Sequence, residues 1–112
     1  MLKSNEKTAL AKFEAEIIKK FPEYVRLLEL FGSKARGDDM GDSDIDVLVV
    51  TEGKDFEKNA EICGTALDFS IDYDTDISPK IFESKEFERL KQRKTIFTKN
   101  VEKDGKILWR KS

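Results

Sequence analysis

Residues 25–50 read VRLLELFGSKARGDDMGDSDIDVLVV, two apolar runs on either side of a polar segment rich in glycine and aspartate. The first run, residues 25–31, has the length and aliphatic content of a mostly buried strand, and Gly32 and Ser33 interrupt it. The second run, residues 43–50, changes from alternating polar and apolar residues to continuously apolar ones, as a strand does when it enters a covered sheet. The segment therefore predicts two strands, with acidic residues at the sheet margin.

Asp44 and Asp46 stand at the start of the second predicted strand. Because side chains alternate across a strand, both carboxylates lie on the same side, with Cα atoms roughly 6.5 Å apart. Such a pair can share two divalent cations, the arrangement that serves in-line phosphoryl transfer. Oxygen ligands favour Mg²⁺ or Mn²⁺ over zinc, so the spacing indicates a site for two Mg²⁺ ions. The alternative reading of the residues alone is a pair of acids that caps a loop.

Gly32 and Ser33 have the composition of a phosphate-binding turn between a strand and a helix. Glycine lets the backbone approach a phosphate closely, and a hydroxyl with free N–H groups at a helix start forms an anion site. Arg36, one turn further on, can add a charge-assisted hydrogen bond to the same phosphates. Each feature alone is weak evidence for nucleotide binding.

The flanking sequence predicts helices and further strands. Apolar residues spaced three and four apart predict an amphipathic helix over residues 4–21, ended by Pro22. The same spacing predicts a second helix over residues 54–71, from Phe56, Ala60, Cys63, Leu67 and Ile71. Within it, Cys63 is interpreted as a small buried apolar residue.

The C-terminal part predicts two strands around one charged helix. Residues 76–82 form the third strand, placed at a sheet edge because Pro79 cannot donate a ladder hydrogen bond. Residues 84–103 form a helix that Gly105 ends, and residues 106–109 a short closing strand. The order of elements predicts an α+β, two-layer fold with a small mixed sheet and helices packed on it.

The composition narrows the class of protein. A chain of 112 residues allows one domain, expected to span residues 1–112. The absence of histidine excludes nucleophiles activated by imidazole and zinc sites that contain histidine. One cysteine, no leader and no long apolar run together predict a cytoplasmic protein without a membrane span.

The charges are unevenly distributed along the chain. Residues 38–76 carry thirteen acidic and two basic residues, whereas residues 77–112 carry five acidic and eleven basic ones. A dense acidic segment favours divalent cations or pairing with basic flanks. The basic C-terminal part has glutamates interleaved at its start, which favours a solvated helix face, so no nucleic-acid partner is expected.

The combined pattern resembles a known family. Gly32-Ser33, ten residues, then Asp44-x-Asp46 is similar to the signature of the DNA polymerase β-like nucleotidyltransferases. The fuller string FGSKARG…SDIDVLVV resembles the minimal nucleotidyltransferases of that superfamily, which consist of the catalytic palm with little else. The resemblance implies that Asp44 and Asp46 bind Mg²⁺ and that Gly32 and Ser33 hold a nucleoside triphosphate, with Arg36 as a further phosphate contact.

The resemblance also implies a third carboxylate on a neighbouring strand. Asp76 is the choice, because it opens the third predicted strand after the second long helix. Asp68, Asp72 and Asp74 remain rivals, although Asp68 and Asp72 are one turn apart on a predicted helix and fit a solvated face better.

These expectations point to a Mg²⁺-dependent nucleotidyltransferase that moves a nucleoside monophosphate, AMP from ATP first of all, to an acceptor hydroxyl. The family resemblance implies a helical HEPN-type protein partner, a ribonuclease-type toxin for which the chain would be the antitoxin. Two alternatives stay open: an inactive binding module that neutralises such a toxin by contact, and a nucleotidyltransferase for a small-molecule acceptor.

Overall fold

The two apolar runs form neighbouring strands. β1 (Val25–Phe31) and β2 (Ile45–Thr51) pair antiparallel, with Phe31 opposite Asp46. The computed structural model that shows this pairing describes residues 2–39, 41 and 43–112. Between the strands lies α2 (Ser33–Arg36), a single helical turn that ends at Gly37 in the left-handed conformation.

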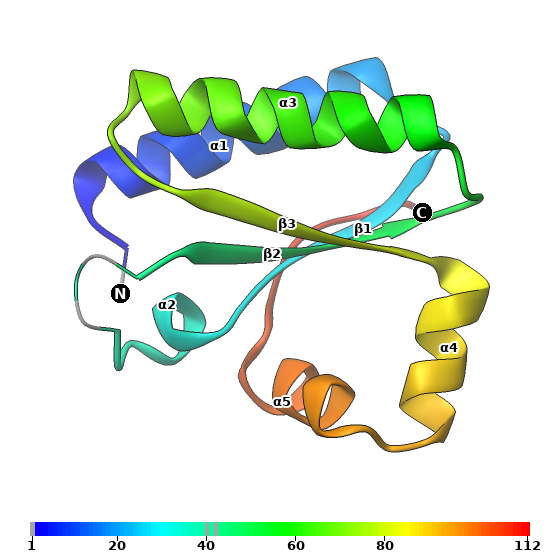
Figure 1. Cartoon of the computed structure of the whole chain (residues 1–112). Helices are drawn as coiled ribbons and strands as arrows, with labels where there is room; N and C mark the ends of the chain where they lie inside the picture. Colours follow the sequence, from blue (N-terminus) through cyan, green and yellow to red (C-terminus); the bar gives the residue numbers. More distant parts are fainter. Residues whose placement is uncertain (1, 40, 42) are drawn as a thin grey trace.

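Two further strands flank this pair (Figure 1). β3 (Ile77–Glu83) runs parallel to β2, and β4 (Lys106–Arg110) runs antiparallel to β1. The order in the sheet is β3-β2-β1-β4, so β3 is an edge strand, as Pro79 predicted. The prediction of a small mixed sheet with helices packed on it is confirmed.

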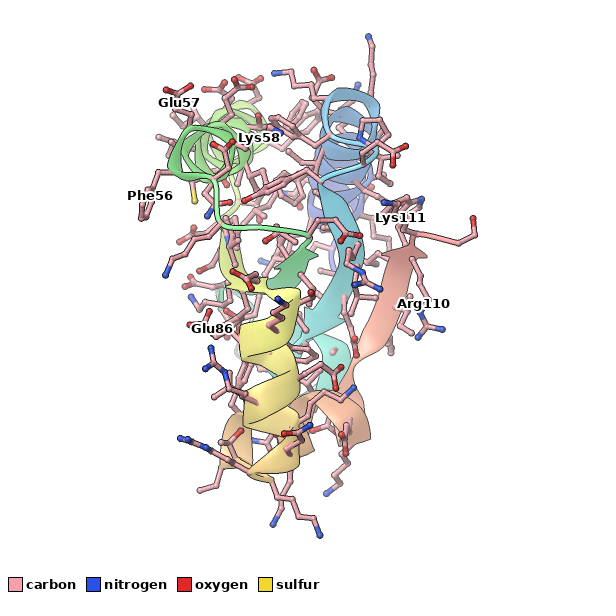
Figure 2. The ribbon with its side chains drawn as sticks, turned by 90° about the vertical axis from the view of Figure 1, so that its right-hand side faces the viewer. Phe56, Glu57, Lys58, Glu86, Arg110 and Lys111 are labelled. Atoms are coloured by element: carbon pink, nitrogen blue, oxygen red, sulfur yellow. The ribbon has the colours of Figure 1, made fainter. Side chains whose placement is uncertain are left out.

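α1 (Ser4–Lys20) and α3 (Phe56–Asp72) lie side by side over one face of the sheet (Figures 1 and 2). α1 ends just before Pro22, whose ring would clash with a continuing helix. Beneath the two helices, alternate residues of β2 point into the larger core. Its buried residues include Phe13, Ile17, Leu28, Ile45, Val47, Val49 and Ile62.

α4 (Ser84–Gln92) and α5 (Ile96–Asp104) cover part of the opposite face. A smaller apolar cluster there contains Leu48, Val50, Phe87 and Val101. The prediction of one continuous helix over residues 84–103 is wrong. Lys94 takes a positive φ of 53°, and the Thr95 hydroxyl accepts a hydrogen bond from the Thr98 N–H, which starts a new helix. A threonine is a preferred N-cap, so the signal for this break was present in the sequence.

α3 presents apolar side chains on two sides. Ile62 and Ala66 are buried, whereas Phe56 is 77% exposed and points away from α1 (Figure 2). Cys63 is also exposed, so its interpretation as a buried residue is wrong. Neither α3 nor any other helix within the described residues is long and apolar enough to cross a membrane.

Candidate active site

The turn after β1 brings Gly32 against Asp46. Gly32 has a φ of 78°, in the left-handed region that favours glycine. A Cβ atom at this position would lie 2.5 Å from Asp46 Oδ2. Both the conformation and the close approach therefore require glycine, and the backbone of the predicted phosphate-binding turn contacts a predicted metal ligand.

The parallel pairing of β2 and β3 places Asp76 beside Asp44. The Ile45 N–H donates a hydrogen bond of 2.8 Å to the Asp76 carbonyl, and Ile45 stands opposite Ile77. Asp46 lies two residues before Leu48 and so projects from the sheet face that α4 and α5 partly cover. Asp46 is half-buried, while Asp44 and Asp76 are exposed at the margin.

The electrostatics reflect this crowding of carboxylates. Burial raises the pKa of Asp46, and the negative charge of Asp44 raises it further, while Lys80 and Arg36 oppose the shift. The pKa of Asp76 is also raised, by burial first and then by a hydrogen bond with Asp44 and repulsion from both other acids. Each carboxylate is therefore easier to ionise when a cation is close.

The carboxylate oxygens of Asp44, Asp46 and Asp76 are ligands of the kind that a hard divalent cation prefers. In the part of the chain that the structure describes, no group of three or more Asp, Glu, Cys or His side chains has the arrangement needed to hold a metal ion. Asp76 instead stands beside Asp44 through its backbone, whose carbonyl accepts from the Ile45 N–H. The fit therefore rests on the pair Asp44 and Asp46, and the role of Asp76 as a third ligand stays a prediction.

The three rival acids lie on α3 and in the turn that follows it. Asp68 and Asp72 are exposed on α3, which covers the sheet face opposite to Asp46. Asp74 lies in the turn after α3 with a φ of 51°, and its carbonyl accepts a hydrogen bond from the Asn5 side chain. Of the four candidates, Asp76 is the one whose backbone pairs with the residue that follows Asp44, through the Ile45 N–H.

Arg36 and Lys80 supply positive charge near the acids. Arg36 Nε donates to Asp38 Oδ2 at 3.0 Å, and Arg36 Nη1 lies 3.9 Å from Asp104 Oδ2 on α5. Lys80, which the sequence pattern did not single out, lies on β3 and donates to the Ser78 hydroxyl at 2.8 Å. Alternation along the strand from Asp76 through Ser78 to Lys80 was the signal that could have found it.

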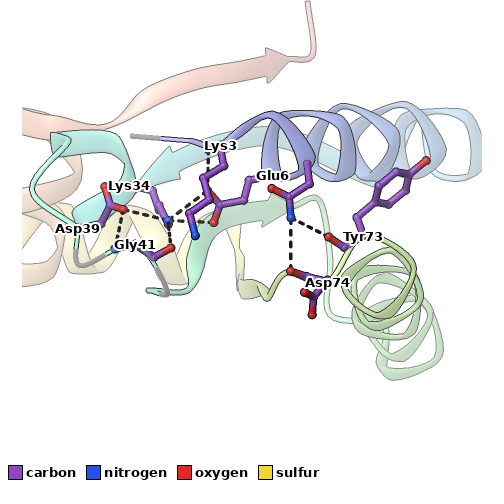
Figure 3. A network of polar contacts seen from close by, with 8 residues as sticks. Lys3, Glu6, Lys34, Asp39, Gly41, Tyr73 and Asp74 are labelled. Atoms are coloured by element: carbon purple, nitrogen blue, oxygen red, sulfur yellow. Dashed lines mark hydrogen bonds and ion pairs between the residues drawn. The ribbon is translucent and has the colours of Figure 1, made fainter.

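Lys34, inside the Gly-Ser-Lys stretch, points toward Glu6, Asp39 and Gly41 (Figure 3). Its ammonium group is fully buried and lies 2.9 Å from both Glu6 Oε2 and Asp39 Oδ2, and 3.1 Å from the Gly41 carbonyl. Burial lowers the pKa of Lys34, but the hydrogen bonds to Glu6 and Asp39 outweigh it, so the net shift is upward. Lys34 therefore ties the turn to the start of α1.

The surface of the described residues includes a cavity near Asp76 and another near α4. One of about 350 Å³ adjoins Asp76 and is lined by Asn5, Ser43 and Asp74 among others. A larger one of about 580 Å³ is lined by residues of α4 and β4, together with Leu27 and Val50. Since Asp46 stands at the other end of β2, we place the chemistry at the carboxylates rather than at the larger cavity.

Comparisons with known proteins identify relatives over most of the chain. The family described as "Polymerase beta, Nucleotidyltransferase" matches residues 15–112. A protein of Methanocaldococcus jannaschii, described as a candidate protein adenylyltransferase, is 33% identical over 105 residues, which cover 94% of this chain and 99% of the relative.

Solved structures share the fold at lower identity. A toxin–antitoxin complex with AMP-PNP has a TM-score of 0.56 at 23% identity, over 88% of this chain and 72% of that one. A candidate nucleotidyltransferase of Sulfolobus solfataricus has a TM-score of 0.53 at 21% identity, over 98% of this chain and 90% of that one. The structure of a tri-AMPylated HEPN toxin of Shewanella oneidensis in complex with an MNT antitoxin has a TM-score of 0.52 at 20% identity. The match covers 93% of this chain and 71% of that one. The family match over residues 15–112 and the M. jannaschii relative show that this chain is a nucleotidyltransferase and belongs to the polymerase beta nucleotidyltransferase family.

Proposed function

We propose that the chain transfers AMP from ATP to a hydroxyl group of a protein partner and releases pyrophosphate. The observation that carries the proposal is the contact of the Gly32 turn with Asp46, beside Asp44 and Asp76. Nucleotidyl transfer needs a turn that binds the phosphates close to carboxylates that bind cations. The triphosphate must be held and its negative charge neutralised at the same place.

In the proposed reaction, each residue of the site has a separate role. The acceptor oxygen attacks the α-phosphorus, the bond from that phosphorus to the oxygen bridging to the β-phosphate breaks, and pyrophosphate leaves. Asp76 would help to deprotonate or orient the acceptor hydroxyl. Gly32, Ser33 and Arg36 bind the β and γ phosphates. Asp44 and Asp46 would hold two Mg²⁺ ions, which supply charge neutralisation for the phosphates when bound.

The relatives support the choice of nucleotide and acceptor. The M. jannaschii relative is described as a candidate protein adenylyltransferase, and the S. oneidensis complex contains a HEPN toxin modified with AMP beside its MNT antitoxin. We extend this to a helical HEPN-type partner, on which the chain acts as an antitoxin in the cytoplasm. The partner would also complete the surroundings of the exposed Asp44 and Asp76.

Transfer of label from α-labelled ATP tests the proposal. With Mg²⁺ and the proteins of a host lysate, the wild-type chain is expected to label a protein band, whereas the Asp44→Asn, Asp46→Asn double variant leaves no label above background. The mass of the band identifies the acceptor. A folded wild-type chain that transfers label from none of the four nucleotides, yet binds a HEPN-type protein, would overturn transfer in favour of a binding module.

Mg²⁺ itself is expected to stabilise the chain through the acidic pair. Saturating Mg²⁺ should raise the wild-type Tm by roughly 2–5 °C, because a ligand that binds only the folded state adds to its stability. The Asp44→Asn, Asp46→Asn variant should lose this response. Without Mg²⁺ its Tm should exceed that of the wild type, since repulsion between the carboxylates is removed.

The matched control for this thermal-shift measurement is Asp68→Asn, Asp72→Asn. It removes the same charge from exposed positions on the other side of the sheet and should keep the full Mg²⁺ response. An unchanged response in the Asp44, Asp46 variant, or a lost one in the control, would place the cation elsewhere.

A further inference from the structure

α3 carries an uncovered apolar stripe along its length. The stripe consists of Phe56, Ala60, Cys63, Leu67 and Ile71, which recur at helical spacing, and all five are exposed. Phe56 is 77%, Leu67 59% and Ile71 70% exposed. The buried side of α3 is a different set, Ile62, Thr65, Ala66 and Ser70, so the stripe is not needed for the core. Contiguous apolar patches of this kind mark interaction sites.

An acidic border runs along one side of the stripe. At about 100° per residue, Glu57, Glu61, Asp68 and Asp72 fall within a sector of about 60° next to it. All four are exposed. The one lysine of α3, Lys58, lies on the other side of this border, with its ammonium group 5.0 Å from the centre of the Tyr24 ring. An occupant of the stripe is therefore favoured if it carries positive charge at its edge.

A second copy of this chain does not meet that condition through α3. Antiparallel pairing of two α3 helices about a two-fold axis would put both acidic borders on the same side, where they repel. Parallel pairing would set each acidic border against Asn59 and Ser70 of the other copy, which carry no charge. In neither arrangement does α3 of the second copy bring a cation to Glu61 or Asp68.

We propose that the stripe is the docking site for an amphipathic helix of a partner protein, with an apolar seam flanked by lysine or arginine. α3 packs on the sheet face opposite to Asp46, so the docked helix leaves the candidate active site open. The proposal depends on the charge and exposure of α3 and not on the transfer activity.

Cys63 allows a direct test, because it is the one cysteine of the chain and lies within the stripe. The rate of Cys63 alkylation is measured with two synthetic helical peptides that share one leucine seam, flanked by lysines in one and by glutamates in the other. The lysine-flanked peptide is expected to slow alkylation at least tenfold at saturation, and the glutamate-flanked peptide less than twofold.

Variants separate the apolar and charged parts of the surface. Leu67→Ser, Ile71→Ser should abolish protection, while Ile96→Ser, Ile107→Ser, which alters exposed apolar residues elsewhere, should retain it. Glu61→Lys, Asp68→Lys should reverse the preference between the peptides. Each variant should keep the wild-type circular dichroism spectrum, because the replaced side chains are exposed.

Three results would overturn the proposal. Equal protection by both peptides would mean that charge does not select the occupant, and no protection by either would mean that the stripe does not receive a helix. Alkylation that slows as the protein alone is concentrated, with a dimer mass in sedimentation, would make a second copy the occupant.

Discussion

Replacing Lys34 by methionine is expected to lower the free energy of unfolding by about 3–5 kcal/mol, the cost of breaking a buried ion pair by removing one partner. Lys34 Nζ lies 2.9 Å from Glu6 Oε2, and both side chains are almost completely buried. Methionine fills a similar volume but leaves the Glu6 carboxylate facing an apolar group. Urea unfolding of the wild type and the variant measures the change from the shift in midpoint at constant m value.

A double-mutant cycle shows whether the loss comes from the uncompensated charge. Adding Glu6→Gln to Lys34→Met should recover about 2 kcal/mol, because a neutral amide costs less to bury than a carboxylate that has lost its cation and keeps the Lys3 N–H as a donor. The exposed pair Lys20 and Glu16, 3.6 Å apart, serves as the control, and Lys20→Met should cost less than about 1 kcal/mol. A loss below about 1 kcal/mol for Lys34→Met would mean that the Glu6 carboxylate reaches water when its partner is absent.

Replacing Gly32 by alanine is expected to reduce nucleotidyl transfer at least about 100-fold, the effect of displacing a reacting group by about 1 Å. The added methyl group would lie 2.5 Å from Asp46 Oδ2, so either the turn or Asp46 must move. Because both are predicted to hold the triphosphate and its cations, either movement separates them. The measurement is the rate of label transfer from α-labelled ATP, with folding followed by circular dichroism.

Gly37→Ala isolates the effect of backbone conformation. Gly37 also has a positive φ, 83°, but apart from its chain neighbours the described residues place no heavy atom within 4 Å of its potential Cβ. This variant should lose about 1 kcal/mol of stability from strain and keep transfer within about fivefold of the wild type. Equal losses of transfer in both variants would show that strain in the turn, and not contact with Asp46, limits the reaction.

Local rules account for much of the sheet. Continuous apolar runs predicted β1 and β2, and alternation placed Asp44 and Asp46 on one side of the strand. The edge position of β3 also followed from a local property, since Pro79 has no N–H for a ladder hydrogen bond. Glycine is required at position 32 for two reasons. The positive φ is a local one, and the close approach of Asp46 is a non-local one.

Periodicity predicted α3 but could not say which apolar side would be covered. Phe56 and Leu67 have the same spacing as a buried stripe and are nevertheless exposed, because Ile62 and Ala66 occupy the side that faces the sheet and α1. A pattern records where apolar residues recur along a helix, whereas burial depends on which neighbouring elements the chain places against it.

The sequence by itself therefore determined β1, β2 and the break between them at Gly32 and Ser33, since each depends on neighbours within a few residues. Only the tertiary structure decided the rest. Parallel pairing with β3 set Asp76 beside Asp44 in preference to its rivals, and α1 buried Lys34 against Glu6. The physical reason is the same in both cases: the energy of a charged side chain depends on partners distant in sequence, which only the packing of the elements brings near.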